Sequence, residues 1–247
     1  MEASNKIALI TGANRGLGSE IGRQLGKLGI TVLLGARNSA SGEAAAEQLV
    51  SEGTKAFFIP LDITDANSIA KAVEIVNTLF GSLDILVNNA VFYARDGQPP
   101  SQISAELLQN YLTTNFVAQV MVTQALLPLL KQSPAGRIVN MSSSAGSITT
   151  MGNANHSNPR IAKATALGYP SSKAALNMFT ALLAKELKDT PIKVNSADPG
   201  WTQTDMGGKE AKYTVEEGAR PAVWLATLDE NGPTGGFFTH NQQVNPW

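Results

Sequence analysis

Ile7-Ala8-Leu9-Ile10-Thr11-Gly12-Ala13-Asn14-Arg15-Gly16-Leu17-Gly18 is the stretch that predicts the fold. Its first four residues are apolar and β-prone, and Leu17, Ile21, Leu25 and Leu28 recur at helical spacing. A strand, a glycine-rich turn and a helix in this order are the usual setting of a dinucleotide-binding site. Glycines let the main chain approach a phosphate closely, and a helix N-terminus offers unpaired N–H groups. The spacing is Gly-x-x-x-Gly-x-Gly, and a glycine turn without a ligand is the alternative interpretation.

Strand-like and helix-like segments alternate along the rest of the chain. Further strands are predicted at residues 31–34, 55–61, 83–87, 137–141, 192–196 and 236–239. Helices are predicted at 41–52, 65–80, 107–130, 170–187 and 216–228, the third of them kinked or ended near Pro128. The alternation predicts a single α/β domain over residues 1–247: a Rossmann-type, doubly wound parallel sheet of about seven strands with helices on both faces. Ligands of such sheets bind beyond the carboxyl ends of the strands.

The composition excludes several classes of protein. The 247 residues are 43% hydrophobic and 16% charged, which fits one globular domain with a substantial core. A net charge of −1 gives no broad field to attract nucleic acid or an acidic membrane surface. Because there is no cysteine and there are only two histidines, disulfides, thiolate chemistry and a multi-histidine metal site are excluded. We find no signal peptide and no stretch of membrane-spanning length, and we expect a cytoplasmic protein that binds neither a membrane nor a metal.

A second motif, Tyr169-Pro170-Ser171-Ser172-Lys173, places a phenol and an ammonium four residues apart. Residues at positions i and i+4 share one face of a helix, so both groups would point into the same space. A nearby ammonium favours the phenolate and makes the phenol usable as an acid or base nearer neutral pH. Taken alone, most pairs of this kind are an aromatic residue near a solvated lysine. Because Pro170 disfavours helical angles at Tyr169, we predict that Tyr169 lies at the edge of the helix.

Together these motifs resemble the short-chain dehydrogenase/reductase family, in its carbonyl-reductase-like branch. The resemblance covers nearly the whole chain, with the motifs in the order that the family shows. They are Gly12/Gly16/Gly18, Asp62, Asn88-Asn89-Ala90, Asn115, Ser142-Ser143, Tyr169, Lys173 and Pro199-Gly200. The resemblance implies an oxidoreductase that binds a nicotinamide cofactor and a small carbonyl or alcohol substrate.

The resemblance also implies roles for four catalytic candidates. Tyr169 would be the acid in reduction or the base in oxidation, and Lys173 would lower its proton affinity and hold the nicotinamide ribose. Ser143, chosen over Ser142 by alignment with the family motif, would donate a hydrogen bond to the substrate oxygen. Asn115 would hold a water that links Lys173 to solvent. The alternatives are a helix-bending role for Asn115 and a capping role for the serines.

The resemblance places the cofactor over the glycine turn and the neighbouring strand ends. Asp62 would contact the adenine, although it could instead cap the next helix, for which Asp65 is better placed. Pro199-Gly200, with Thr202 and Thr204, would contact the nicotinamide carboxamide and the pyrophosphate, and a simple turn is the alternative. The predicted cofactor-binding residues are Gly12, Asn14, Arg15, Gly16, Leu17, Gly18, Arg37, Asp62, Ile63, Asn89, Ala90, Tyr169, Lys173, Pro199, Gly200, Thr202 and Thr204.

The end of the second predicted strand indicates the type of cofactor. An acid there would bind a ribose 2′-hydroxyl and repel a 2′-phosphate. The region reads Leu34-Gly35-Ala36-Arg37-Asn38 and contains no acid. Arg37 can bind a phosphate through paired hydrogen bonds, and Arg15 lies in the glycine turn. We therefore predict NADP(H) rather than NAD(H), the alternative being that both arginines are solvated surface charges.

Two features depart from the family pattern. Val91 follows Asn88-Asn89-Ala90 where the family has glycine, and its branched side chain could narrow the pocket or shift the loop. Twenty-six positions separate Ser143 from Tyr169, about twice the usual spacing, and the extra residues lie in the polar, aperiodic segment 147–168, predicted to be a functional loop. An insertion here can cover the faces that other members use in tetramers, so we expect a monomer or a dimer.

These observations favour an NADPH-dependent carbonyl reductase that converts a ketone or aldehyde to an alcohol. Segments 147–168 and 201–213 are predicted to line the substrate cleft. The predicted substrate-binding residues, which could equally be packing residues, are Phe92, Tyr93, Met151, Trp201 and Met206. Two alternatives stay open: an alcohol dehydrogenase of the same family that works in the oxidative direction, and a non-catalytic NADP(H)-binding sensor or scaffold.

Overall fold

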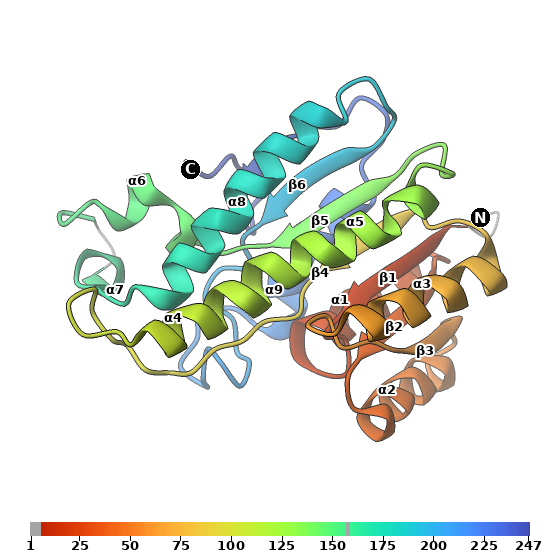
Figure 1. Ribbon diagram of the computed structural model, residues 1–247, viewed down its shortest axis with the longest axis horizontal. Helices are drawn as coiled ribbons and strands as arrows, with labels where there is room; N and C mark the ends of the chain where they lie inside the picture. The colour runs from red at the N-terminus through yellow and green to blue at the C-terminus, as the bar shows by residue number, and fades with distance from the viewer. Residues whose placement is uncertain (1–5, 157–158) are drawn as a thin grey trace.

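The computed structural model describes residues 6–156 and 159–247 and shows one parallel sheet between two layers of helices (Figure 1). Its strand order is β3-β2-β1-β4-β5-β6-β7, and every pairing is parallel. The strands are β1 Ile7–Thr11, β2 Thr31–Ala36, β3 Ala56–Pro60, β4 Ile85–Asn88, β5 Arg137–Met141, β6 Lys193–Ala197 and β7 Phe237–Phe238. The predicted fold class is therefore confirmed.

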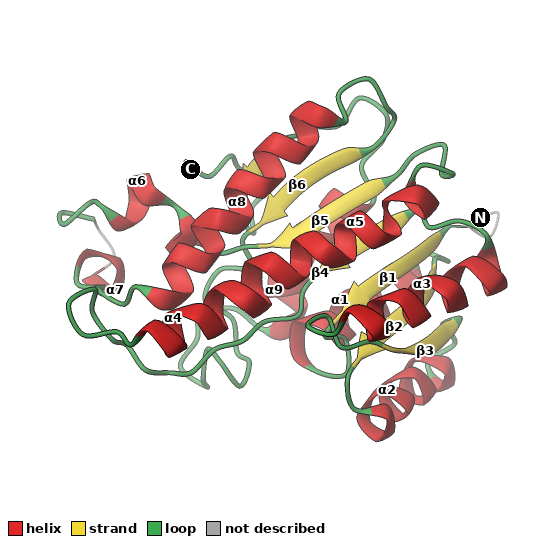
Figure 2. Cartoon of the chain, viewed as in Figure 1, coloured by secondary structure: helices red, strands yellow, loops and turns green. Residues whose placement is uncertain are grey.

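The helices divide between the two faces of the sheet (Figure 2). On one face lie α1 Gly16–Lys27, α2 Ser39–Ser51 and α9 Val215–Ala226; on the other lie α3 Ala66–Phe80, α5 Ala118–Leu130 and α8 Gly168–Glu186. The short elements are α4 Ala105–Leu112, α6 Ile148–Met151, α7 Pro159–Ala162, the π-helical segment η1 Thr113–Val117 and the 3-10 segment η2 Ser144–Gly146.

Alternation along the central strands builds a separate core on each face. In β1, Ala8 and Ile10 belong to the cluster under α1, α2 and α9, whereas Ile7 and Leu9 belong to the cluster under α3, α5 and α8. Successive side chains of a strand point to opposite faces, so a strand buried on both sides needs apolar residues at every position. This is why β1 reads as a continuous apolar run rather than as an alternating one.

The long helix predicted at 107–130 is continuous but not uniform. It runs through α4, η1 and α5, and the π-helical turn contains Asn115, which is fully buried. Such turns occur mostly as single insertions and often at functional sites. Pro128 lies inside α5 and the helix ends soon after it, as predicted.

The expectation that no segment has membrane-spanning length is wrong for this helix. By length and composition alone, Ala105–Leu130 could cross a membrane. Within the fold, however, Val122, Leu126 and Leu130 are buried in the core on the sheet. The core helix of a globular domain meets the same criteria, so the finding carries no further conclusion.

Segment 147–168 is not the unbroken loop that its lack of periodicity predicts, because it contains α6 and α7. Ser147 caps α6 by accepting a hydrogen bond from the amide of Thr150 at 3.0 Å. Helices of a single turn need a cap but no repeating apolar face, and hydrophobic periodicity cannot detect them. At the end of the segment, α8 begins at Gly168, which places Tyr169 in its first turn as predicted.

Arg137, at the start of β5, is a buried cation held by backbone carbonyls. Its guanidinium donates two hydrogen bonds to Leu228 O, at 3.0 and 2.7 Å, and one each to the carbonyls of Gly136, Pro191 and Asp229. Burial lowers the pKa of Arg137, yet these acceptors satisfy every one of its donor directions. The side chain thereby ties the segment that follows α9 to the sheet.

We expect Arg137→Met to lower the free energy of unfolding by about 3 kcal/mol, because it leaves buried carbonyl groups without partners. Urea denaturation of both proteins measures the difference. Arg220→Met is the matched control, since Arg220 is exposed and its ion pair with Glu216 spans 3.7 Å; its effect should stay within about 0.5 kcal/mol. Equal losses in the two variants would contradict this role for Arg137.

Candidate active site

The predicted site residues gather at one edge of the sheet, where the strands end. Strands β1, β4, β5 and β6 are consecutive neighbours, and all run in the same direction. Their carboxyl ends are followed by the glycine turn, Asn89-Ala90, Ser142-Ser143 and Asp198-Pro199-Gly200. The chain leaves β1 towards β2 but returns to the other side of β1 as β4. This change of direction marks the position where doubly wound sheets bind ligands.

The glycine turn packs directly on the end of β4. A Cβ on Gly12 would lie 2.8 Å from the Cα of Ala90, and one on Gly18 would lie 2.6 Å from Asn89 Nδ2. Asn89 Nδ2 donates to the carbonyls of Thr11 and Gly12, at 2.9 and 3.1 Å. The glycines at both positions are thus required by close approach to Asn89 and Ala90, whose predicted contact with a cofactor stays a prediction.

The N-terminus of α1 is left open to a ligand. Side chains cap α2, α3, α4 and α9, namely Asn38, Asp65, Ser104 and Thr214, whereas α1 and α8 have no side-chain cap and no acid in the first turn. Gly16 has φ +57, and a Cβ there would meet only Thr204, at 4.0 Å. An uncapped N-terminus beside open space fits a pyrophosphate group. The Leu17 side chain packs against the core instead, so only its backbone can face such a ligand.

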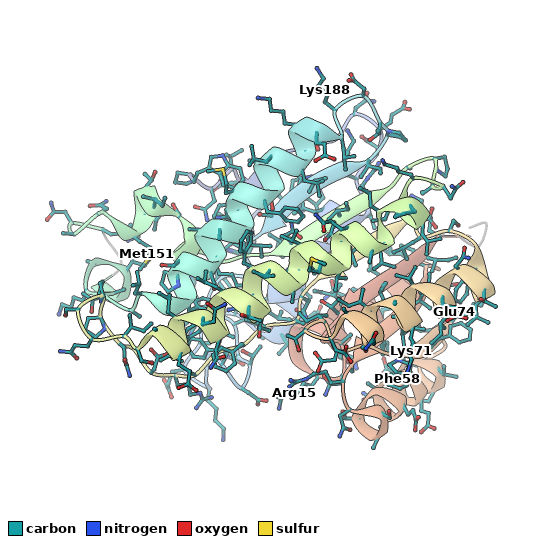
Figure 3. All side chains as sticks on the ribbon, in the orientation of Figure 1. Arg15, Phe58, Lys71, Glu74, Met151 and Lys188 are labelled. Carbon is teal, nitrogen blue, oxygen red and sulfur yellow. The ribbon has the colours of Figure 1, made fainter. Side chains whose placement is uncertain are left out.

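Two arginines flank this N-terminus. Arg37 follows β2, is exposed and forms no ion pair within the described part of the chain. Arg15, at the lower edge of the molecule in Figure 3, pairs with Asp205 at 2.8 Å, and both side chains are about three-quarters exposed, at 76% and 75%. An exposed ion pair contributes about 1 kcal/mol at most, so a phosphate can replace Asp205 as the partner of Arg15. Asn14 donates to Ser41 Oγ at 3.1 Å and ties the turn to α2.

The other predicted cofactor residues are partly engaged within the protein. Asp62 accepts hydrogen bonds from Thr64, 2.9 Å from its amide and 2.7 Å from its hydroxyl, while Ile63 is buried. Asp65, not Asp62, caps α3, so that alternative role of Asp62 is excluded. Contact of Asp62 with an adenine stays a prediction.

Pro199 and Gly200 form a tight turn after β6. Gly200 has φ +67, and a Cβ there would lie 2.7 Å from the ring of Tyr213. The hydroxyl of the buried Thr202 donates to Pro199 O at 2.9 Å, and Thr204 Oγ1 accepts from the amide of Gly207 at 3.1 Å. Both hydroxyls therefore close turns within the protein, which leaves their predicted contacts with a cofactor untested.

Ser143, Tyr169 and Lys173 meet beyond the end of β5. Ser143 forms a side-chain hydrogen bond with Tyr169, and its Oγ also accepts from the amide of Ala145 at 3.2 Å. The Nζ atom of Lys173 lies 5.7 Å from the centre of the Tyr169 ring and donates to the carbonyl of Met141 at 2.8 Å. This contact with Tyr169 favours Ser143 over Ser142 as the candidate donor to a substrate oxygen. The Oγ atom of Ser142 is buried without a hydrogen-bond partner among the described residues.

A buried chain of polar side chains holds α8 in this position. Asn88 Nδ2 donates to Asn140 Oδ1 at 2.8 Å, and Asn140 Nδ2 donates to Thr180 Oγ1 at 2.8 Å. The hydroxyl of Thr180 lies 2.8 Å from that of Ser196. The chain links β4, β5 and β6 to the helix that carries Tyr169 and Lys173. Buried networks of this kind fix one arrangement of the elements they join.

Burial dominates the proton affinities at the site. It raises the pKa of Tyr169, and the hydrogen bond with Ser143 opposes this only in part. Burial also lowers the pKa of Lys173 to about 7. The expected lowering of the phenol pKa is therefore not found in the free protein, because burial of the phenol has the larger effect and raises its pKa. The phenol stays protonated at neutral pH, which is the form that a proton donor needs.

Asn115 joins the loop after β4 to the first turn of α8. Its Oδ1 accepts from the amide of Phe92 at 2.7 Å, and its Nδ2 donates to Phe92 O at 3.0 Å and to Ser172 Oγ at 3.1 Å. Ser172 in turn donates to the backbone carbonyl of Tyr169 at 2.7 Å. The side chain thus holds the first turn of α8 in place, and the predicted water at Asn115 stays a prediction.

The predicted substrate residues differ in their relation to Tyr169. The ring of Tyr93, which is 41% exposed, meets that of Tyr169 edge-on, with centres 5.4 Å apart. Phe92 packs instead on the buried Tyr111 at 5.1 Å. Trp201 donates to Gly207 O at 2.9 Å within segment 201–213, which also holds Met206, and Met151 lies on α6 (Figure 3). Val91 is 41% exposed, and its effect on the pocket or the loop stays a prediction.

Two acids beside the site were missed in the sequence. Asp198 is buried and accepts hydrogen bonds from Ser144 and from the amide of Gly200, the latter at 2.9 Å. Asp96 accepts from the hydroxyl of Tyr111. The signal for Asp198 was an acid placed directly after a buried strand and before Pro199-Gly200. Nothing local in the sequence indicates that Asp96 reaches Tyr111.

Comparison with known proteins identifies the family. A family profile described as short chain dehydrogenase matches residues 6–214. The chain is a short-chain dehydrogenase. Carbonyl reductase [NADPH] 1 of Sus scrofa is 33% identical over 283 aligned positions, covering 99% of this chain and 95% of that protein. (+)-Neomenthol dehydrogenase of Arabidopsis thaliana is 34% identical, with 98% of both chains covered.

A solved structure shares the same architecture. The NADPH-bound carbonyl reductase from chicken fatty liver is 29% identical and has a TM-score of 0.85, with 98% of this chain and 99% of that chain covered. The predicted family is thus confirmed, and this short-chain dehydrogenase is an oxidoreductase. The alignment with the porcine relative is longer than the 247 residues of this chain, so that relative has stretches without a counterpart here.

The low pKa of Lys173 predicts how the stability of the ligand-free short-chain dehydrogenase depends on pH. Between about pH 7 and the unfolded value of 10.5, the folded state binds fewer protons at Lys173 than the unfolded state does. The free energy of unfolding should therefore rise with pH, by up to about 1.4 kcal/mol per pH unit. Tyr169 acts in the opposite sense only above its unfolded value near 10.

Urea denaturation between about pH 7.5 and 9.5 tests this expectation in the wild type and in Lys173→Met. The variant lacks the titrating group, so its stability should change much less with pH. If the free energy of unfolding changed equally with pH in the two proteins, the folded state would not disfavour the ammonium form of Lys173.

Proposed function

We propose that this short-chain dehydrogenase is an NADPH-dependent carbonyl reductase that converts an aldehyde or ketone to an alcohol. The observation that carries the proposal is the meeting of Ser143, Tyr169 and Lys173 at the end of β5. This strand pairs with β4, whose end contacts the glycine turn. Carbonyl reduction requires a proton donor and a donor to the developing oxyanion, both within reach of a bound nicotinamide.

NADP(H) is the cofactor that the charges favour. The N-terminus of α1 would bind the pyrophosphate through the amides of Gly16, Leu17 and Gly18. Arg37, exposed after β2 where an acid would select NAD(H), would bind the 2′-phosphate together with Arg15. A carbonyl reductase with NADPH in its name is 33% identical over 99% of the chain, which supports the same cofactor.

The reaction adds a hydride and a proton across the C=O bond. When bound, NADPH supplies the hydride for the carbonyl carbon. Ser143 donates a hydrogen bond to the carbonyl oxygen as negative charge develops there. Tyr169 donates its phenolic proton to the same oxygen, which completes the alcohol. Lys173 stabilises the phenolate that remains, and solvent restores its proton, by way of the water proposed at Asn115.

The surroundings of Tyr169 favour an apolar substrate. The ring of Tyr93, which is 41% exposed, packs edge-to-face with that of Tyr169. We expect segments 147–168 and 201–213 to add Met151, Trp201 and Met206 to the substrate cleft. We expect the substrate to be a bulky or aromatic ketone. We also expect the enzyme to be a single domain over residues 1–247 and a monomer or a dimer.

Two alternatives stay open. If the reaction ran in reverse, with Tyr169 as the base, the same groups would oxidise an alcohol, and the name of one relative, (+)-neomenthol dehydrogenase, describes that direction. A non-catalytic NADP(H)-binding sensor is the remaining alternative.

Tyr169→Phe tests the proposed acid. We expect kcat/KM for NADPH-dependent ketone reduction to fall by about 10²- to 10⁴-fold, because the phenylalanine ring has no proton to donate. The dissociation constant of NADPH should change by less than about threefold. Tyr93→Phe is the matched control, since it removes the neighbouring hydroxyl and keeps the ring contact of 5.4 Å. Unchanged turnover in Tyr169→Phe would refute the mechanism, and tight NADPH binding by a wild type without turnover on any ketone would favour the sensor.

Arg37→Asp tests the choice of cofactor. An acid after β2 should repel a 2′-phosphate and accept a hydrogen bond from a 2′-hydroxyl, so the ratio of kcat/KM with NADPH to that with NADH should fall at least about tenfold. Steady-state kinetics with both cofactors measure the ratio. Arg220→Asp, on the exposed face of α9, makes the same change in charge and should leave the ratio unchanged. A wild type that prefers NADH would reject the assignment.

A further inference from the structure

Asp198 is a buried carboxylate for which the proposed mechanism has no use. It is 4% exposed, at the point where the chain leaves β6. Its oxygens accept hydrogen bonds from Ser144 Oγ, from the amide of Gly200 at 2.9 Å and from Asn245 Nδ2 at 3.5 Å. No lysine, arginine or histidine within the described residues forms an ion pair with it. A buried charge without a counter-ion is costly, so its presence calls for an explanation.

The contacts of Asp198 lead to both halves of the proposed site. Ser144 follows Ser143, whose hydroxyl bonds to Tyr169. Gly200 belongs to the turn that the family resemblance assigns to the nicotinamide carboxamide and the pyrophosphate. The negative charge of Asp198 contributes to the raised pKa of Tyr169. At His240, burial lowers the pKa, and the charge of Asp198 opposes that lowering. The field of Asp198 thus extends across the site.

We infer that Asp198 is a positioning residue whose negative charge makes this site favour the oxidised over the reduced nicotinamide. The inference rests on the proposed function. The nicotinamide ring of NADP⁺ carries a positive charge that the ring of NADPH lacks, so a nearby carboxylate stabilises NADP⁺ relative to NADPH. Release of a hydride is then favoured on the protein, although the overall equilibrium in solution is unchanged.

The ratio of two dissociation constants tests the inference without any turnover. Titration calorimetry gives the Kd of NADP⁺ and the Kd of NADPH for each purified full-length protein. In Asp198→Asn, the ratio Kd(NADP⁺)/Kd(NADPH) should rise by roughly tenfold, the effect of one charge across a partly screened site. The amide keeps the shape of the carboxylate and an acceptor for the Gly200 amide. A ratio within about twofold of wild type would overturn the inference.

Two further variants separate charge from packing. Ser144→Ala removes a hydrogen bond of Asp198 but keeps its charge, so the ratio should stay within about twofold of wild type. A change as large as that in Asp198→Asn would make the effect one of geometry and overturn the inference. Asp205→Asn removes the exposed acid beside Arg15; both constants should shift together, because phosphate groups are common to both cofactor forms.

Folding of the variants and cofactor binding by the wild type decide the other outcomes. Where Asp198→Asn does not fold, as judged by circular dichroism, Asp198→Ser takes its place, since a hydroxyl can still accept from the Gly200 amide. Failure of both neutral variants to fold would assign Asp198 to the fold alone and overturn the inference. A wild type that binds neither NADP⁺ nor NADPH would instead refute the proposed function itself. If the wild type reduces ketones but the neutral variants have the same ratio Kd(NADP⁺)/Kd(NADPH) as the wild type, only the role of Asp198 is refuted.

Discussion

The contact between the glycine turn and the end of β4 is the constraint on which the site depends. At Gly12 and Gly18 there is no room for a Cβ, and Asn89 joins the two segments through two backbone carbonyls. Because α1 begins directly after the turn, this contact fixes where its N-terminus points. The absence of a side-chain cap on α1 would destabilise an ordinary helix, by about 1 kcal/mol on typical measurements. In a protein whose ligand is an anion, the same open N-terminus is a binding site.

Two buried cations show how a structural charge differs from a functional one. Arg137 and Lys173 are both almost fully buried, at 3% and 2% exposed. Arg137 forms five hydrogen bonds with backbone carbonyls, whereas the described bond of Lys173 is the single one to Met141 O. An ammonium has three donors, and among the described residues only one of those of Lys173 forms a hydrogen bond. The lower pKa of Lys173 is the consequence of this incomplete solvation, and a bound ribose would complete it.

Sequence reasoning predicted the fold correctly and selected most residues of the candidate site, because both rest on local signals. The apolar run of β1, the glycines of the turn and the spacing of Tyr169 and Lys173 are each legible over a few residues. What it missed depends on contacts between distant segments. These are the hydrogen bond between Tyr111 and Asp96, and the burial and nearby charges that raise the pKa of Tyr169. The shift in the pKa of Tyr169 was predicted in the wrong direction. Proximity to Lys173 can be inferred from the spacing of the two residues, whereas the burial of both groups cannot.

The charges at the site complement the movement of charge in a reduction. In the proposed reduction, negative charge would develop on the carbonyl oxygen and pass to the phenol of Tyr169, whose ring centre lies 5.7 Å from Lys173 Nζ. Positive charge develops on the nicotinamide, the end of the cofactor assigned to the turn that Asp198 anchors through the amide of Gly200. In the proposed reduction, each buried charge would thus lie near the opposite charge that the reaction creates. Preorganised charges need no rearrangement during the reaction, which is the most effective form of electrostatic catalysis. On this argument the cost of burying Lys173 and Asp198 in the free protein is recovered in the transition state.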